Sequence, residues 1–232
     1  MDLQQVSSNR RTKRQNYPVI AAQKFIRLFS DVIRPNQEQQ AMLAAAYYVL
    51  ATEQNLSINR SKMHVNAAIT LLKNIVQDYR KTNWRSQIAH AYFKRAELQE
   101  EKSAFNSAGD DYKNAITILE EDQGKITQDK DHLLLARSAL SIADLMVHEQ
   151  VELNEEKPSH PLFYVNKALE YLGKIHDLND EIWTTYAYAH QIAGICLSTD
   201  HFNEACNAFQ AALLMVFKTQ DIKIKPTRQC QK

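Results

Sequence analysis

The chain has 232 residues, of which 44% are apolar, four are glycine and five are proline. This much apolar sequence excludes wholesale disorder, and the scarcity of the two residues that interrupt helices indicates long helical segments. The net charge of +1 divides into +3 for residues 1–17, +4 for residues 218–232 and −6 for the body between them. An acidic body argues against a nucleic-acid-binding domain, which would carry a basic face on its folded part.

Apolar residues recur three and four positions apart in nine segments, the pattern of a helix with one buried face. In chain order the predicted helices cover 18–33, 35–54, 59–81, 84–102, 105–119, 131–153, 161–175, 180–198 and 203–219. Residues 1–17 are predicted to form a disordered basic tail and 218–232 a basic C-terminal tail, which leaves 18–217 as one helical domain. The two-residue alternation of a strand occurs at 221–225, in a segment too short to predict one.

One spacing pattern recurs along the chain: a helix with a small residue is followed by a helix carrying alanine, an aromatic residue and alanine. The clearest instance comprises Ala189, Ile192, Ala193, Cys196, Phe202, Ala205, Phe209 and Ala212. The next comprises Tyr92, Ala96, Phe105, Ala108, Tyr112 and Ala115. Alanine at a crossing lets two helix axes approach to about 8 Å. Repeated helix pairs indicate a stacked array, and such arrays usually bind other molecules.

This pattern resembles the tetratricopeptide repeat (TPR) family over residues 36–217. The resemblance implies an all-α fold: a right-handed array of antiparallel helix pairs, a TPR-like α-solenoid of about nine helices. Ala193 would face Ala205, Phe202 would plug the turn and Phe209 would fill the core. In the middle pair, Ala143 would lie on the first helix, with Ala168 on the second.

The chain also departs from the family. Its alanines at 46, 96, 143 and 193 are 50, 47 and 50 residues apart, whereas the family repeats about every 34 residues. Glu120 stands where the motif closes with proline. A related helical-repeat family, or a non-repeating helical bundle, would also fit the pattern.

In TPR proteins the first helix of each pair lines an inner groove. Carried over to this chain, the resemblance implies the groove residues Tyr47, Phe93, Glu97, Glu100, Glu101, Leu140, Asp144, His148, His190 and Leu197. The carboxylates among them suit a basic or amphipathic partner, although 97–101 can equally be a solvated helix face. Chaperone-docking members grip a peptide carboxylate with lysine and asparagine. The positions of this chain that correspond to those lysines and asparagines hold Phe93, Leu140, His190, Glu97, Asp144 and Gly194. None of them is lysine or asparagine, which argues against such a carboxylate clamp.

The sequence offers little catalytic chemistry. His190, Cys196, His201 and Cys206 form a suggestive group of metal ligands, but a spacing of six places the first two about 240° apart on a helix. No glycine-rich phosphate loop, Gly-flanked serine, His-Glu-x-x-His or Cys-x-x-Cys pattern is present. Arg85 and His90 resemble the Arg, four residues, His arrangement of some helical ribonucleases. We therefore predict no cofactor, no metal and no catalytic residue, with Arg85/His90 as the enzyme alternative.

Three cysteines without a dense framework argue against a disulfide-stapled secreted domain. The basic, polar N-terminus does not resemble a signal peptide, and no apolar run approaches the roughly 18–20 residues that span a bilayer. These features predict a soluble cytoplasmic protein, with export by a route without a cleaved signal left open.

The favoured hypothesis is a non-catalytic interaction scaffold or adaptor whose partner is a peptide or amphipathic helix of another protein. The alternatives are a nuclease-type enzyme and tethering to nucleic acid or acidic membrane through the basic tails. Homodimerisation through an exposed end of the array is also open, because the helices at 18–33 and 203–219 would have to cap those ends or pair.

Overall fold

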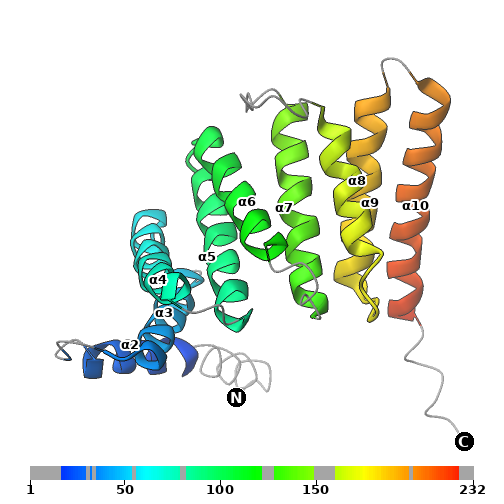
Figure 1. The fold of residues 1–232 in the computed structure, drawn as a ribbon. Helices are drawn as coiled ribbons and strands as arrows, with labels where there is room; N and C mark the ends of the chain where they lie inside the picture. Colours follow the sequence, from blue (N-terminus) through cyan, green and yellow to red (C-terminus); the bar gives the residue numbers. More distant parts are fainter. Residues whose placement is uncertain are drawn as a thin grey trace, which may run out of the picture. The chain divides into compact units, whose positions relative to one another are not determined.

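The computed structural model describes residues 17–29, 32, 35–53, 56–78, 82–121, 128–148, 160–198 and 201–224, and all regular secondary structure within them is α-helical. The helices are α2 (Tyr17–Phe29), α3 (Gln37–Ala51), α4 (Ile58–Asp78), α5 (Thr82–Glu100), α6 (Phe105–Glu120), α7 (Asp129–Val147), α8 (Pro161–Leu172), α9 (Asp180–Leu197) and α10 (Phe202–Ile224) (Figure 1). This confirms the all-α fold class predicted from the apolar periodicity.

The chain divides into two compact units, Met1–Lys102 and Ser103–Lys232, and each is described by itself. In the first unit α2 packs on α3, α3 on α4 and α4 on α5. In the second unit α6 packs on α7, α7 on α8, α8 on α9 and α9 on α10, and α7 also contacts α9. Helices that follow each other in the chain thus pack as antiparallel pairs, consistent with a helical array.

Several predicted helix ends differ from the structure. Val32 lies outside α2, which ends at Phe29. His148 is the C-cap of α7, so this helix stops before the predicted 153. α10 continues to Ile224 and takes up the segment whose alternation resembled a strand, because the helix propagates along its own backbone hydrogen bonds. Residues 1–16 and 225–232 of the predicted tails lie outside the described residues.

An asparagine cap sets the start of α3. Asn36 accepts a hydrogen bond from the Gln39 backbone N–H, and the Gln39 side chain accepts one from the Asn36 N–H, both at 2.9 Å. This capping box satisfies two N–H groups that a helix start leaves unpaired. It makes Gln37, rather than the predicted Pro35, the first helical residue of α3.

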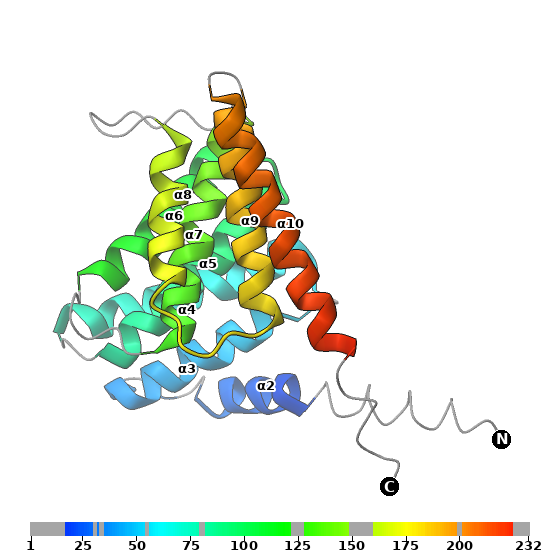
Figure 2. The same ribbon diagram turned by 90° about the vertical axis from the view of Figure 1, so that its right-hand side faces the viewer.

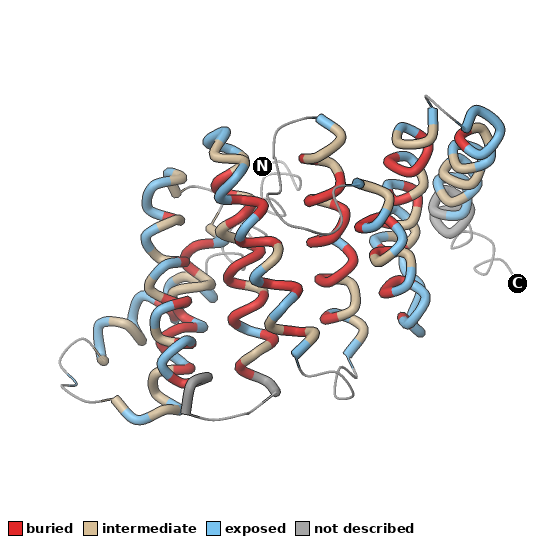
Figure 3. The backbone as a smooth tube through the Cα atoms, turned by 45° about the horizontal axis from the view of Figure 1, so that its top comes forward, coloured by how far each residue is buried: buried red, intermediate tan, exposed pale blue. Residues whose placement is uncertain are grey.

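The core of each unit is built from small and branched side chains. In the first unit Ala44, Val65 and Ala68 are fully buried, and Trp84 packs with Ala41 and Ile75. In the second unit α7 has the largest share of buried residues among the helices, and its trace is largely red in Figure 3. Its core residues Leu135, Ala136, Ser138, Ala139, Leu140, Ile142 and Ala143 are each at most 1% exposed.

The alanine positions of the pattern hold within the second unit, but both phenylalanine predictions are wrong. Ala143 on α7 and Ala168 on α8 are fully buried where these helices pack, and Ala205 on α10 is buried beside α9. Phe202, however, is 74% exposed and does not plug the turn, because it lies at the first position of the last helix of the unit. Phe209 lies beside Gly194 of α9 and is 38% exposed, so it does not fill the core. Ala96 in the first unit and Ala108 in the second are each fully buried.

Candidate functional site

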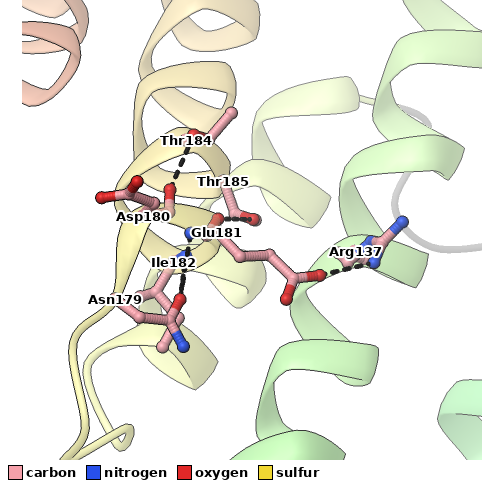
Figure 4. Close-up of polar contacts among 7 residues, drawn as sticks. All are labelled: Arg137, Asn179, Asp180, Glu181, Ile182, Thr184 and Thr185. Atoms are coloured by element: carbon pink, nitrogen blue, oxygen red, sulfur yellow. Dashed lines mark hydrogen bonds and ion pairs between the residues drawn. The ribbon is translucent and has the colours of Figure 1, made fainter. Parts of the chain in front are cut away.

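Two ties fix α9 against α7 in the second unit. Asn179 caps α9 by accepting hydrogen bonds from the N–H groups of Glu181 and Ile182. The Glu181 carboxylate then accepts a hydrogen bond from Arg137 Nη1 at 3.0 Å (Figure 4). Because both side chains are exposed, this ion pair adds little stability, but it shows that the side chains of residues 137 and 181 lie next to each other.

The second tie lies at the start of α7. The Asp129 carboxylate accepts hydrogen bonds from the backbone N–H groups of Asp177 at 3.1 Å and His176 at 3.3 Å. These hydrogen bonds, that of Asp177 first, favour the charged carboxylate and lower its pKa. The loop between α8 and α9 is thereby held on α7.

Two rows of accessible side chains run from the Arg137–Glu181 pair. The row on α7 continues at steps of three and four residues through Ser141, Asp144 and His148. The row on α9 continues in the same way through Thr184, Tyr188, Gln191 and Ile195. Each residue is exposed or partly exposed. Because α7 and α9 are in contact and both run antiparallel to α8, the rows lie side by side in the same direction. We call these nine residues the α7–α9 surface.

The α7–α9 surface combines apolar anchors with polar groups. Tyr188 and Ile195 are 38% and 37% exposed. The row on α7 carries the Asp144 carboxylate and the His148 imidazole, whose Oδ1 and Nε2 are 3.5 Å apart. Arg137 and Glu181 balance each other's charge at the other end. Such a surface can hold an apolar side chain and orient it by hydrogen bonds or a salt bridge.

The predicted groove residues of the first unit occupy different environments. Tyr47 is half-buried and stacks on His64 with ring centroids 5.8 Å apart; burial and then the charge of Arg60 lower the pKa of His64. Phe93 is buried and belongs to the core. Glu97 pairs with Lys94 at 2.9 Å, which offsets the acidic character predicted there. Glu100 is partly exposed and Glu101 exposed.

The predicted groove residues of the second unit fall into two sets. Asp144 and His148 belong to the α7–α9 surface, whereas Leu140 is 1% exposed and lies in the core, where it offers no surface to a partner. His190 and Leu197 are partly buried, and burial lowers the pKa of His190. At 100° per residue, His190 lies about 160° around α9 from Tyr188. It therefore faces away from the row that Tyr188 belongs to.

Sequence reasoning missed Tyr188, Gln191 and Ile195. The signal was present in their spacing, which continues three and four residues at a time from the capped start of α9. Their apolar members resembled core residues, however, because a tyrosine and an isoleucine on a helix of an array are more often buried. The alignment with α7 that leaves them exposed comes from tertiary packing.

Arg85 and His90 do not converge into a site. The five-residue step places them about 140° apart around α5. His90 Nδ1 donates a hydrogen bond to the Ser86 carbonyl oxygen at 2.9 Å, which holds the imidazole along its own helix. Among the described residues no three His, Cys, Asp or Glu side chains gather as metal ligands would. Burial raises the pKa of the Cys196 thiol, which makes it less reactive.

An open hollow of about 580 Å³ lies in the first unit, at the start of α3. Its lining residues are Pro35, Asn36, Gln37, Glu38, Gln40, Asn74 and Trp84. Two of its amides bond to the chain's own backbone: Asn36 in the capping box and Gln40 through Nε2 to the Pro35 carbonyl oxygen at 2.9 Å. The hollow is therefore a surface depression beside the N-terminus of α3, where these amides serve the helix start.

No protein-family model matches the chain, and no curated protein matches it at a significant level. The resemblance to TPR proteins thus depends on helix pairing and alanine spacing alone. The coarser description stands: the described residues form an all-helical protein whose sequential helices pack in antiparallel pairs. None of the described helices has the length and apolar character needed to cross a membrane.

Proposed function

We propose that the protein is a non-catalytic scaffold or adaptor that binds a peptide or helix of another protein on the α7–α9 surface. The accessible rows of α7 and α9 carry this proposal, because the Arg137–Glu181 ion pair shows that the two rows meet and because Tyr188 and Ile195 are exposed among polar side chains. The finer assignment to a TPR-like groove belongs to this proposal as well, since helix pairing supports it and family comparison does not.

Recognition would depend on a few anchors in a preformed surface. An apolar side chain of the partner would pack on Tyr188 and Ile195, where most of the affinity would arise. A lysine or arginine of the partner would approach Asp144, which would steer association and set orientation more than it adds affinity. Because ten residues of α7 are buried, the helix would be held rigid and the surface would lose little entropy on binding.

The alternatives have less support. A nuclease-type enzyme using Arg85 and His90 would need side chains that converge, and these two point to different sides of α5. Tethering to nucleic acid or acidic membrane depends on basic tails that lie mostly outside the described residues. It remains a prediction, as does the cytoplasmic location.

Selection of peptides from a random display library on the immobilised protein tests the proposal. We expect enriched peptides to pair an apolar residue with a basic one. Their binding should weaken at least tenfold in Ile195→Glu and in Asp144→Lys, the latter most at low salt. Phe163→Glu is the matched control, because Phe163 on α8 is 41% exposed and lies outside the α7–α9 surface. Peptides that lose binding equally in the control, or in none of the variants, would contradict the proposal.

A further inference from the structure

The two units of the chain carry opposite net charges. Residues 1–102 contain 16 lysines and arginines against 8 aspartates and glutamates, a net charge of +8, whereas residues 103–232 contain 12 against 19, a net charge of −7. The net charge of −6 between the tails is therefore a sum over two units of opposite sign. Such an asymmetry is typical of chains in which one part meets a polyanion, so the acidic sum does not exclude nucleic acid from the first unit.

Four cations of the first unit lie along the line where α4 packs on α5 (Figure 2). On α4, four polar side chains recur at steps of three, four and seven residues and so fall within about 60° of one another: Asn59, Lys62, Asn66 and Lys73. α5 adds Arg95, and Lys102 follows just after its end. Each of the six side chains is exposed or partly exposed. We call these six residues the α4–α5 seam.

Two hydrogen bonds between the helices orient the asparagine side chains of the seam. Lys102 Nζ donates one to Asn59 Oδ1, and Arg95 Nη1 donates one to Asn66 Oδ1 at 3.0 Å. Both amide oxygens are thereby used, and the Nδ2 hydrogens of the two asparagines stay available as donors. Together with the ammonium and guanidinium groups, these amides make the seam a surface of hydrogen-bond donors.

The positive charge of the seam is not balanced by carboxylates. Lys62, Lys73 and Lys102 form no ion pair with any residue that the structure describes. α4 has no aspartate or glutamate between residues 58 and 77, and the glutamates at 97, 100 and 101 lie at least 120° around α5 from Arg95. Like charges gathered in this way repel each other, and a polyanion relieves that repulsion.

A phosphate backbone matches the seam better than an acidic peptide or a bilayer does. Phosphate oxygens only accept hydrogen bonds, so they suit a surface of donors, whereas a peptide also brings backbone N–H groups that need acceptors. Within the described part of α4, Met63 is the one large apolar side chain that is exposed. A single such side chain gives little insertion into lipid, which membrane-binding helices achieve with a whole apolar face.

The seam can contact a backbone without reading bases. Lys73 Nζ and Arg95 Cζ lie 5.5 Å and 5.1 Å from the centroid of the Tyr92 ring. This ring is only 3% exposed, so a base cannot stack on it as bases do in single-strand-binding proteins. From Asn59 to Lys73 the seam extends about 21 Å along α4, a length that several successive phosphates of one strand occupy. A duplex presents such a line of phosphates on its outside.

We propose that the α4–α5 seam binds the phosphate backbone of a nucleic-acid duplex without selecting its sequence. The seam belongs to the folded part of the first unit and does not depend on the basic tails. It also lies in a different unit from the α7–α9 surface, so this proposal neither needs nor excludes the scaffold function.

Fluorescence anisotropy of the full chain with labelled DNA and RNA duplexes of about 20 base pairs tests the proposal. The wild type should bind at low salt, and Lys62→Gln/Lys73→Gln should weaken binding at least tenfold and make the slope of log affinity against log salt shallower by about 2. Lys62→Arg/Lys73→Arg keeps the charge and should keep the binding. Lys24→Gln/Lys94→Gln is the matched control, because it removes the same charge from α2 and from another side of α5, and it should change the slope by less than about 0.5.

Helix content by circular dichroism shows whether each variant folds, and Lys62→Gln alone, with a slope change of about 1, replaces the double variant if it does not. A wild type that binds neither duplex at low salt would overturn the proposal. So would equal losses in the seam variant and the control, because binding would then depend on the tails or on net charge. Poly-glutamate that competes as well as an unlabelled duplex would assign the seam to an acidic peptide. Tighter, seam-dependent binding to phosphatidylserine vesicles would assign it to a membrane, and either result would contradict a nucleic-acid site.

Discussion

Gly194 on α9 lies against the Phe209 ring on α10, and Gly194→Ala should change the sign of its effect on stability when this ring is removed. A Cβ atom at Gly194 would lie 2.7 Å from Cε1 and Cζ of the Phe209 ring and 2.9 Å from its Cδ1. Carbon atoms in contact normally lie about 3.5–4.0 Å apart. Gly194→Ala alone therefore forces the ring or the helix to move, although alanine is the better helix former.

The two effects can be compared in size. Overpacking of this kind costs about 1–3 kcal/mol, and replacing glycine with alanine inside a helix gains about 1 kcal/mol. The ring of Phe209 is 38% exposed and can yield in part, so we expect Gly194→Ala to destabilise the second unit by about 1 kcal/mol. Once Phe209→Ala has removed the ring, the same substitution should stabilise by about 1 kcal/mol. The coupling energy between the two sites is then about 2 kcal/mol.

Urea denaturation followed by tryptophan fluorescence can measure this cycle. The chain has two tryptophans, Trp84 in the first unit and Trp183 in the second. In a Trp84→Phe background, Trp183 reports the second unit alone, which keeps the unfolding of the two units from mixing in one signal. A coupling energy below about 0.5 kcal/mol, or a stabilising Gly194→Ala with Phe209 present, would refute the close packing of these helices.

Three further substitutions in the second unit have defined outcomes in the same assay. Ser138→Ala should stabilise the second unit by about 1 kcal/mol, because the Ser138 hydroxyl is fully buried and its Oγ has no hydrogen-bond partner. A loss of stability would show that the hydroxyl does form a hydrogen bond. Glu120→Gln should destabilise by about 1 kcal/mol. The Glu120 carboxylate accepts hydrogen bonds from Lys167 Nζ, at 2.8 Å, and from the buried Tyr171 hydroxyl, and these bonds connect α6 to α8. An unchanged midpoint of the urea transition would mean that this connection contributes nothing to stability. Burial lowers the folded-state pKa of His190 from 6.5, so the unfolded chain binds the proton more readily and stability should fall as the pH drops below about 6.5. His190→Gln should reduce this slope between pH 7 and 5, and an identical slope would count against the assignment.

Local patterns were enough to predict the helices and much of their packing. The three- and four-residue recurrence of apolar residues located all nine described helices, because burial of one helix face leaves that period in the sequence. The alanines at 143, 168 and 205 predicted close helix contacts, since a small side chain at a crossing has a steric cause that tertiary context rarely overrides. Helix ends were less well predicted. The end of α7 depends on a chain segment that carries no strong stop signal near His148.

The accessible face of each helix could not be predicted with the same success. Leu140 and Asp144 lie one turn apart on α7, yet Leu140 is 1% exposed and belongs to the core, whereas Asp144 is partly exposed. On α9 the accessible row contains Tyr188 and Ile195, while the more polar His190 is turned away. Which side of a helix stays open depends on the rotation set by packing against its neighbours, and the same packing brings together the groups of the Arg137–Glu181 and Asp129 contacts. These contacts join residues more than 40 positions apart in the chain.

Photo-crosslinking in cells of the native host tests the proposed scaffold function most directly. A photoreactive phenylalanine analogue replaces Tyr188 in one variant and Phe163 in another, two aromatic positions of the same unit that are 38% and 41% exposed. The proposal predicts that a protein crosslinks at position 188 and not at 163, and that Asp144→Lys reduces the product. Equal crosslinking at both positions, or none at 188, would contradict binding on the α7–α9 surface.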